Sequence, residues 1–199
     1  MAILSDSKIL ERISDGDIII EPFQRKNLGS NSYDVTLGNS LLMYKMDKEF
    51  LDTKTPNQFY EVTIPENGYV LKPGILYLGV TNEFTKTKKD VIMFEGKSSL
   101  ARMGLLVHIS SGFGDVGYTG YFTLEFSCIH PIKIYPNMKI GQLYYQTVDG
   151  LVINPYDLKK DAKYNNSSSK PIASKMHENF IEKFRDRFRD SGITFNPEK

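Results

Sequence analysis

The sequence is poor in the residues that stabilise small secreted domains and zinc-bound domains. Its 199 residues include one cysteine, Cys128, and three histidines. A single cysteine cannot form an intrachain disulfide, which fits a reducing compartment. There is no Cys-x-x-Cys pair, so a closed structural zinc site is not expected either.

Long apolar runs and an excess of one charge are also missing. The formal net charge is +1, so no overall field favours nucleic acid or a membrane as a partner. The first residues, "MAILSDSKILERISDGD", lack the basic start and the apolar run of a signal peptide. No apolar run approaches the roughly 18–20 residues that span a bilayer. We therefore expect a cytoplasmic protein without a nucleic-acid or membrane partner.

The sequence does contain a long series of short strand signals. The segment "LSDSKILERISDGDI" predicts one helix, capped by Ser5 or Asp6 and ended by Gly16. After it, apolar segments are separated by turn residues such as Asn67-Gly68, at intervals of roughly 8–12 residues. This pattern predicts a mainly β fold, a sandwich or a barrel, rather than a β-α-β sheet.

The last part of the chain has a different composition. A polar stretch leads into "ASKMHENFIEKFRDRFRDS", where apolar residues recur at four-residue spacing: Met176, Phe180, Phe184 and Phe188. This spacing predicts an amphipathic helix, and hence a domain over residues 1–175 followed by a helix and tail over 176–199. Such a stripe is typical of a helix that packs on its own domain or on a neighbouring subunit. Acidic residues alternate with the arginines, which disfavours a nucleic-acid role.

Polar residues gather in "GKSSLAR", which contains Lys97, Ser98, Ser99 and Arg102. Cations and hydroxyls beside a glycine suit several phosphate oxygens at once. The pattern is not a P-loop, because G-x-x-x-x-G-K-[ST] is absent. From residue types alone, a turn with a surface arginine is an equally good interpretation.

The glycine-rich segment "GFGDVGYTG" carries one carboxylate and two aromatic residues. Glycines allow the backbone to approach a ligand closely. Asp115 could accept hydrogen bonds from sugar hydroxyls, and Tyr118 or Phe113 could pack on a sugar or a base. The alternative is a hairpin loop whose aspartate binds turn amides.

The segment "YFTLEF" alternates as a strand, which places Glu125 on the same face as Tyr121 and Thr123. A carboxylate among apolar strand neighbours could act as a proton shuttle. An exposed strand glutamate is the commoner case, and the sequence leaves open which face is buried. His108, in the apolar segment "LLVHIS", is more typical of a structural histidine.

Together these segments resemble the dCTP deaminase family, within the trimeric dUTPase-like superfamily. "GKSSLARMGLLVH" is close to the family's "G-[RK]-SS-L-[AG]-R-L-G" signature, and "GFGDVGYTGYFTLEF" resembles "GFIDPGFxGxxTLEL". "PIKIYPNMKIGQL" resembles "PIxLxPGMKIGQL". The likeness runs from about Ile3 to Lys175 with the motifs in the same order, which makes it specific.

The resemblance implies a distorted β-barrel or jelly-roll-like subunit with short N- and C-terminal helices. It also implies a homotrimer whose active sites lie between subunits. The implied reaction is hydrolytic deamination of dCTP to dUTP and ammonia, with Mg²⁺ bound through the triphosphate and without zinc. Zinc deaminases need H-x-E and P-C-x-x-C ligands, and this sequence has neither.

Carried over by position, the resemblance implies four catalytic residues. Glu125 would be the general base that activates water for attack on C4 of the cytosine. Ser98 and Arg102 would hold the water, the intermediate and Glu125 in position. The backbone at Ser111 would contact the reacting centre.

The resemblance also implies the substrate contacts. Asp115 would hold the deoxyribose 3′-hydroxyl, Tyr118 would pack where a 2′-hydroxyl would clash, and the backbone of Thr123 and Leu124 would contact the base. The implied phosphate-binding positions are Lys97, Ser98, Ser99, Arg102, Gln142, Tyr156, Lys163 and Tyr164, some of them from a neighbouring subunit or the C-terminal tail.

One departure from the family concerns the substrate. The family's C-terminal glutamine, which helps to read the base, falls on Ser167 in "KYNNSSS". A site that reads less of the triphosphate could also accept dCMP. dTTP, an inhibitor within the family, is a further expected ligand.

Deamination of dCTP to dUTP is the leading expectation, and three alternatives stand beside it. The first is a bifunctional enzyme that also releases pyrophosphate and forms dUMP, because Phe113 stands where some monofunctional members have arginine. The second is a plain dUTPase, which Glu125 disfavours. The third is a nucleotide-sensing trimer without activity, which the intact set of Lys97, Ser98, Arg102 and Glu125 disfavours.

Overall fold

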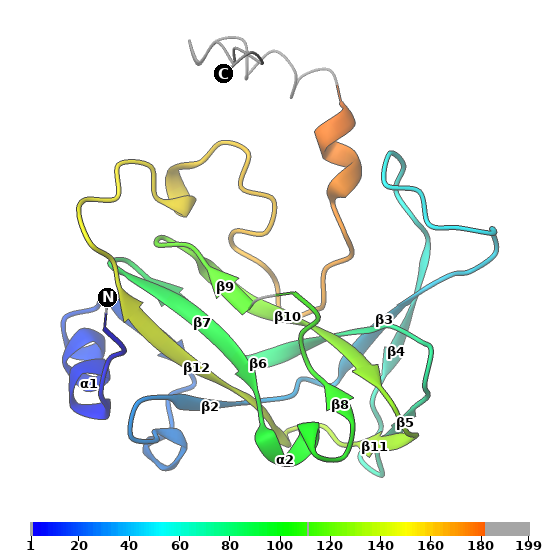
Figure 1. Cartoon of the computed structure of the whole chain (residues 1–199), viewed down its shortest axis with the longest axis horizontal. Coiled ribbons are helices and arrows are strands. Elements are labelled where there is room, and N and C mark those ends of the chain that lie inside the picture. Colours follow the sequence, from blue (N-terminus) through cyan, green and yellow to red (C-terminus); the bar gives the residue numbers. More distant parts are fainter. Residues whose placement is uncertain (1, 111, 182–199) are drawn as a thin grey trace, which may run out of the picture.

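Antiparallel strands dominate the structure, a computed structural model that describes residues 2–110 and 112–181 (Figure 1). The strands are β1 (Ile18–Glu21), β2 (Tyr33–Thr36), β3 (Ser40–Tyr44), β4 (Phe59–Thr63), β5 (Tyr69–Leu71), β6 (Tyr77–Thr87), β7 (Asp90–Gly96), β8 (Leu105–Leu106), β9 (Gly112–Gly114), β10 (Thr119–Cys128), β11 (Ile132–Ile134) and β12 (Lys139–Thr147). The α-helices are α1 (Asp6–Ser14) and α2 (Ser98–Ala101), and the 3₁₀ helices are η1 (Arg25–Asn27), η2 (Tyr156–Leu158) and η3 (Met176–Phe180).

The largest sheet has the order β4-β3-β6-β10-β8, and β1 pairs with β6 outside this path. The long strands β6 and β10 pair antiparallel at its centre. A second sheet has the order β2-β12-β7-β9, and β11 pairs with β5 in a small third sheet. The mainly β prediction is therefore confirmed.

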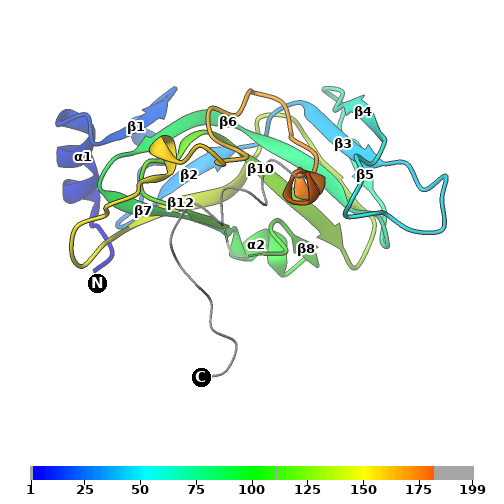
Figure 2. The same cartoon turned by 90° about the horizontal axis from the view of Figure 1, so that it is seen from above.

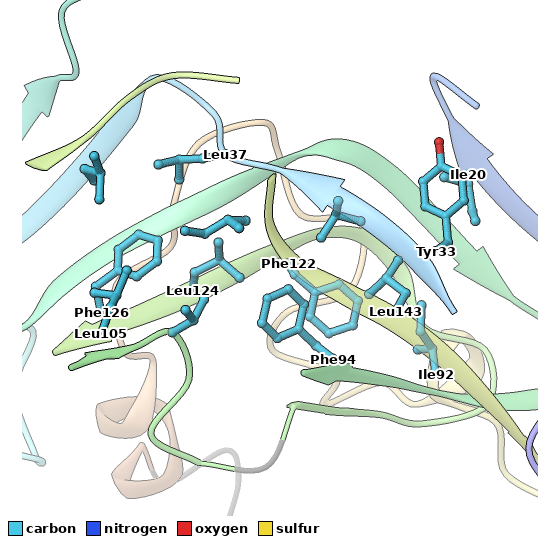
Figure 3. Close-up of a cluster of buried hydrophobic side chains, with 14 of the residues drawn as sticks. Ile20, Tyr33, Leu37, Ile92, Phe94, Leu105, Phe122, Leu124, Phe126 and Leu143 are labelled. Carbon is cyan, nitrogen blue, oxygen red and sulfur yellow. The ribbon is translucent and has the colours of Figure 1, made fainter. Parts of the chain in front are cut away.

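The hydrophobic core lies between the two large sheets (Figure 3). Phe122, Leu124 and Phe126 of β10 point into it, and Phe94 of β7 and Leu143 of β12 meet them from the other sheet. All five side chains are buried. The period of two in β10 thus places its apolar residues in the core and its polar residues on the opposite face.

The predicted N-terminal helix is confirmed as α1. Ser5 caps it by accepting a hydrogen bond from the backbone N–H of Lys8. Gly16 follows the helix with a φ of +69°, a conformation that glycine adopts easily. Ile9 packs into the core from this helix.

After β12 the chain has little regular structure and returns over the large sheet. We call residues 163–177 the C-terminal strap. Seen from above, it crosses the region of β6 and β10, and its last two residues begin η3 (Figure 2). The predicted C-terminal helix is described only as η3, and Phe184 and Phe188 lie outside the described residues. In the described part of the chain, no helix is long and apolar enough to span a membrane.

Candidate active site

A cavity of about 500 Å³ lies on the polar face of β10. Tyr121, Thr123 and Glu125 line it, so the alternation of this strand delivers the polar residues to the cavity. The C-terminal strap and the loop between β3 and β4 form further walls. The sequence did not decide whether this face of the strand is buried or exposed, and the structure shows that it lines a cavity.

Glu125 is held by the backbone that follows β8. The N–H groups of Ile109 and Ser110 donate to its Oε2 at 3.1 and 3.2 Å. These bonds fix the orientation of the carboxylate while the side chain lines the cavity. An oriented carboxylate on a cavity wall can take a proton from a bound water and return it to a substrate. The adjacent Ser111 lies outside the described residues, so its implied role stays a prediction.

His108 also lines the cavity, and the sequence had left its role ambiguous. Its Nδ1 is buried and has no hydrogen-bond partner within the described residues. Burial lowers the pKa of His108, and the charges of Glu125 and Glu95 only partly oppose this. His108 is therefore neutral at pH 7, beside the carboxylate of Glu125.

Tyr118 lies on the cavity wall as a rigid aromatic surface. Its ring packs at 4.9 Å from Phe122 and 6.3 Å from Tyr156, between ring centres. Its hydroxyl donates to the carbonyl of Tyr121 at 2.9 Å, and burial raises its pKa to about 12. Asp115 does not line the cavity, and its carboxylate lies 3.5 Å from Lys159 Nζ.

The residues around α2 form a separate group, away from the cavity lining. Lys97 and Lys139 both contact the carboxylate of Asp34, at 2.6 and 2.9 Å. Burial alone would raise the pKa of Asp34, but the hydrogen bonds from the two lysines outweigh it and lower that pKa. Arg102 Nη1 donates to Ser98 Oγ at 3.4 Å.

Gln142 belongs to the same side of the molecule as α2. It pairs with Asp34 across β2 and β12, and its side chain accepts a hydrogen bond from Ser32 at 3.3 Å. Ser98, Ser99 and Arg102 are exposed. One chain therefore carries two groups of the predicted site residues, and only one of them lies at the cavity. Asp34 was missed, because nothing in "NSYDVTLGN" marks it as the partner of Lys97.

The remaining predicted residues lie on or near the strap. Tyr164 and Ser167 line the cavity, whereas Tyr156 and Lys163 do not. The hydroxyl of Tyr156 accepts from the backbone N–H of Tyr164 at 3.1 Å. Leu124, whose predicted contact is through its backbone, has a fully buried side chain.

Metal ligands are not gathered anywhere in residues 2–110 and 112–181: no three His, Cys, Asp or Glu side chains are placed to hold an ion. The expectation that Mg²⁺ binds through the nucleotide, without zinc, stays a prediction.

Comparisons with known proteins identify the family. A model of the dCTP deaminase-like family matches residues 3–148. A protein of Clostridium botulinum (strain Eklund 17B / Type B) is 52% identical over 166 residues, which cover 83% of this chain and 92% of the relative. A protein of Clostridium acetobutylicum is 46% identical over 180 residues, covering 90% of this chain and 99% of the relative. Both are named "dCTP deaminase, dUMP-forming".

Among solved structures, a 2′-deoxycytidine 5′-triphosphate deaminase from Agrobacterium tumefaciens has a similar fold, with a TM-score of 0.58 and 20% sequence identity. The match covers 76% of this chain and 50% of the other, so this chain spans half the length of that protein. The expectation that the reaction stops at dUTP is wrong for these relatives, because their names give dUMP as the product. The chain belongs to the dCTP deaminase-like family.

Proposed function

We propose that this chain converts dCTP and two waters to dUMP, ammonia and pyrophosphate. The observation that carries the proposal is Glu125, oriented by two backbone amides on the wall of a nucleotide-sized cavity. The names of the relatives support dUMP as the end product. The bifunctional alternative therefore replaces simple deamination.

Deamination would begin with Glu125 as general base. It takes a proton from water, and the hydroxide attacks C4 of the cytosine ring. Glu125 then returns the proton to the ring nitrogen, and the amino group leaves as ammonia after a second proton transfer. A carboxylate held from one side by amides suits this shuttle, because its position is unchanged between the two transfers.

Phosphate cleavage needs cations near the triphosphate, and the group at α2 is suited to supply them. Lys97 and Arg102 carry the charge, and Ser98 and Ser99 carry hydroxyl donors. Mg²⁺ would bind the phosphate oxygens of the nucleotide itself, keeping several waters. dTTP shares the deoxyribose, triphosphate and pyrimidine ring of the substrate, so it is the inhibitor to test.

A homotrimer with sites between subunits would bring together the residues at the cavity and the residues around α2, which lie apart within one chain. Arg102 and Ser98 of one subunit would complete the cavity around Glu125 of the next. Exposed apolar side chains surround α2 and support burial by a second copy: Met103 is 55% exposed, Leu106 47% and Ile129 65%. The cytoplasm remains the proposed location, given the lone cysteine.

The test is a product assay with dCTP and Mg²⁺, in which nucleotides and pyrophosphate are separated and quantified. We expect dUMP and pyrophosphate in equal amounts, with dUTP never accumulating beyond a transient. Accumulation of dUTP as the final product would contradict the proposal. No loss of dCTP would favour the sensor without activity, and a parallel reaction with dCMP tests whether the triphosphate is required.

A further inference from the structure

The C-terminal strap lies along the N-terminal half of an edge of β10, which has no strand partner among the described residues. β10 pairs with β6 along one edge. On the other edge β8 pairs with Ser127 and Cys128, and Glu125 N–H donates to the carbonyl of Val107 at 3.0 Å. Backbone groups on an open edge need partners from elsewhere. At Thr119 and Tyr121 the strap supplies them.

Ser167 makes the central contact of the strap. The backbone N–H of Tyr121 donates to Ser167 Oγ at 2.6 Å, and the same hydroxyl donates to the carbonyl of Tyr121 at 2.7 Å. One side chain thereby satisfies both backbone groups of one strand residue. Tyr118 donates to that carbonyl too, so the clamp is joined to the aromatic wall of the cavity.

Gly120 is shaped for this contact. Its φ is +139°, and a Cβ at this position would lie 2.1 Å from Ser167 Oγ and 2.7 Å from Ser167 N. Only glycine lets the strap approach so closely. The close contact between Gly120 and Ser167 leaves no room for a side chain longer than serine at position 167.

Neighbouring contacts extend the clamp in both directions. Asn166 N–H donates to the carbonyl of Thr119 at 2.8 Å, and Thr119 N–H donates to Asn165 Oδ1 at 3.2 Å. Further along, Ile172 N–H donates to Thr123 Oγ1 at 3.1 Å. Beyond Ser167 the strap delivers Ile172, Ser174, Met176 and His177 to the cavity lining.

The hydroxyl of Ser167 has little left to offer a nucleotide. A serine has one O–H donor, and here the carbonyl of Tyr121 takes it. Phosphate oxygens accept hydrogen bonds, so Ser167 cannot donate to them without releasing the strap. The side chain is also only 8% exposed.

We propose that Ser167 is a positioning residue, which clamps the strap onto β10 and so sets the affinity for the nucleotide. This replaces the direct nucleotide contact that the family resemblance implied for this position. The inference rests on the proposed function for the identity of the nucleotide, but the clamp itself does not depend on it.

The test compares Ser167→Ala and Ser167→Gln with wild type, and uses the exposed neighbour substitution Ser168→Ala as the matched control. Hydrogen exchange of the nucleotide-free chain reports the clamp, through the Tyr121 amide and peptides of residues 163–177. Steady-state turnover of dCTP reports the affinity, and thermal unfolding reports any global loss of structure.

We expect Ser167→Ala to exchange faster at Tyr121 and along the strap, and to raise KM about tenfold with kcat changed less than threefold, as loss of a buried hydrogen-bonding group predicts. Ser167→Gln should behave in the same way or worse, because its side chain cannot fit beside Gly120. Ser168→Ala should match wild type in both measurements.

Unchanged exchange in Ser167→Ala would overturn the clamp, and so would a lower KM in Ser167→Gln, which would mean that this position still reads the nucleotide. Faster exchange with an unchanged KM would overturn the link to affinity. If wild type does not turn over dCTP, the proposed function fails, while the exchange comparison still decides whether Ser167 holds the strap.

Discussion

The cavity beside β10 and the surface around α2 hold their polar residues in opposite ways. At the cavity, Glu125 is fixed by two backbone amides, and the strap and the β3–β4 loop form the other walls. At α2, Ser98 and Arg102 are exposed, and Lys97 is fixed by Asp34 rather than by a binding pocket. A residue that moves protons must be held within hydrogen-bond reach of the water and the substrate. Residues that bind phosphates can lie exposed on the surface of one subunit, provided that the cavity of a second subunit holds the nucleotide against them.

If this contrast is correct, the cavity side controls the chemical step, and Glu125→Gln has the largest effect. Glutamine keeps the size of the side chain but cannot take a proton from water. We expect kcat for deamination to fall by roughly 10²–10⁴ or more, while binding of dCTP, measured by calorimetry, is retained.

Glu21→Gln is the matched control for that substitution. Glu21 lies on β1, away from the cavity lining, and is exposed. It should keep the kcat of wild type within about twofold, in line with ordinary surface substitutions. Normal turnover by Glu125→Gln would contradict the mechanism in which the Glu125 carboxylate is the general base.

The second prediction concerns whether the two regions meet between copies. Glu125→Gln and Arg102→Ala should each be nearly inactive alone. Mixed, partly unfolded and refolded together, they should recover activity, because an intact Glu125 in one subunit can meet an intact Arg102 in the next. Random mixing of equal amounts in a cyclic trimer leaves about a quarter of the sites intact. A mixture that stays inactive, while refolded wild type is active, would place both residues in one subunit's site.

The sequence predicts the local parts of this arrangement better than the distant ones. The face of Glu125 follows from the period of two in "YFTLEF", and the N-terminal helix follows from Ser5 and Gly16, because both patterns are local. The family motifs name Lys97 and Arg102 as site residues. They do not show that one chain keeps them apart from the cavity.

Asp34 and Ser167 show why the contacts between distant segments could not be predicted from the sequence. Asp34 becomes the partner of Lys97 only because β2 and β7 both flank β12, a matter of strand order. Ser167 contacts Tyr121 only because Gly120 permits a backbone approach from a distant segment. Neither contact leaves a periodic or compositional signal in the chain.

A third prediction separates affinity from chemistry on the α2 side. Lys97→Ala should raise KM for dCTP by about tenfold, as expected for loss of a hydrogen bond to a charged group, with a smaller change in kcat. Lys139→Ala is the control, since Lys139 also contacts Asp34 but is outside the predicted phosphate group. Equal effects of the two substitutions on KM would mean that both act through Asp34 and not through the phosphates.

The smallest expected effect concerns Asp34 and pH. Its pKa is lowered in the folded protein, so the carboxylate stabilises the fold above its unfolded-state pKa. This contribution is lost as the pH falls from the unfolded-state value, about 3.9, through the lower folded-state value. Asp34→Asn should therefore be less stable than wild type at neutral pH by about 1 kcal/mol or less, because the pair is partly exposed.

The difference between wild type and Asp34→Asn should shrink as the solution becomes acidic, and urea unfolding at a series of pH values measures it. Asp47→Asn, at an exposed position in the β3–β4 loop, should keep the pH dependence of wild type. A gap between wild type and Asp34→Asn that is constant from neutral to acidic pH would contradict the assignment. In that case the difference in stability would come from how the asparagine amide packs, and not from the loss of the charge that Asp34 shares with Lys97 and Lys139.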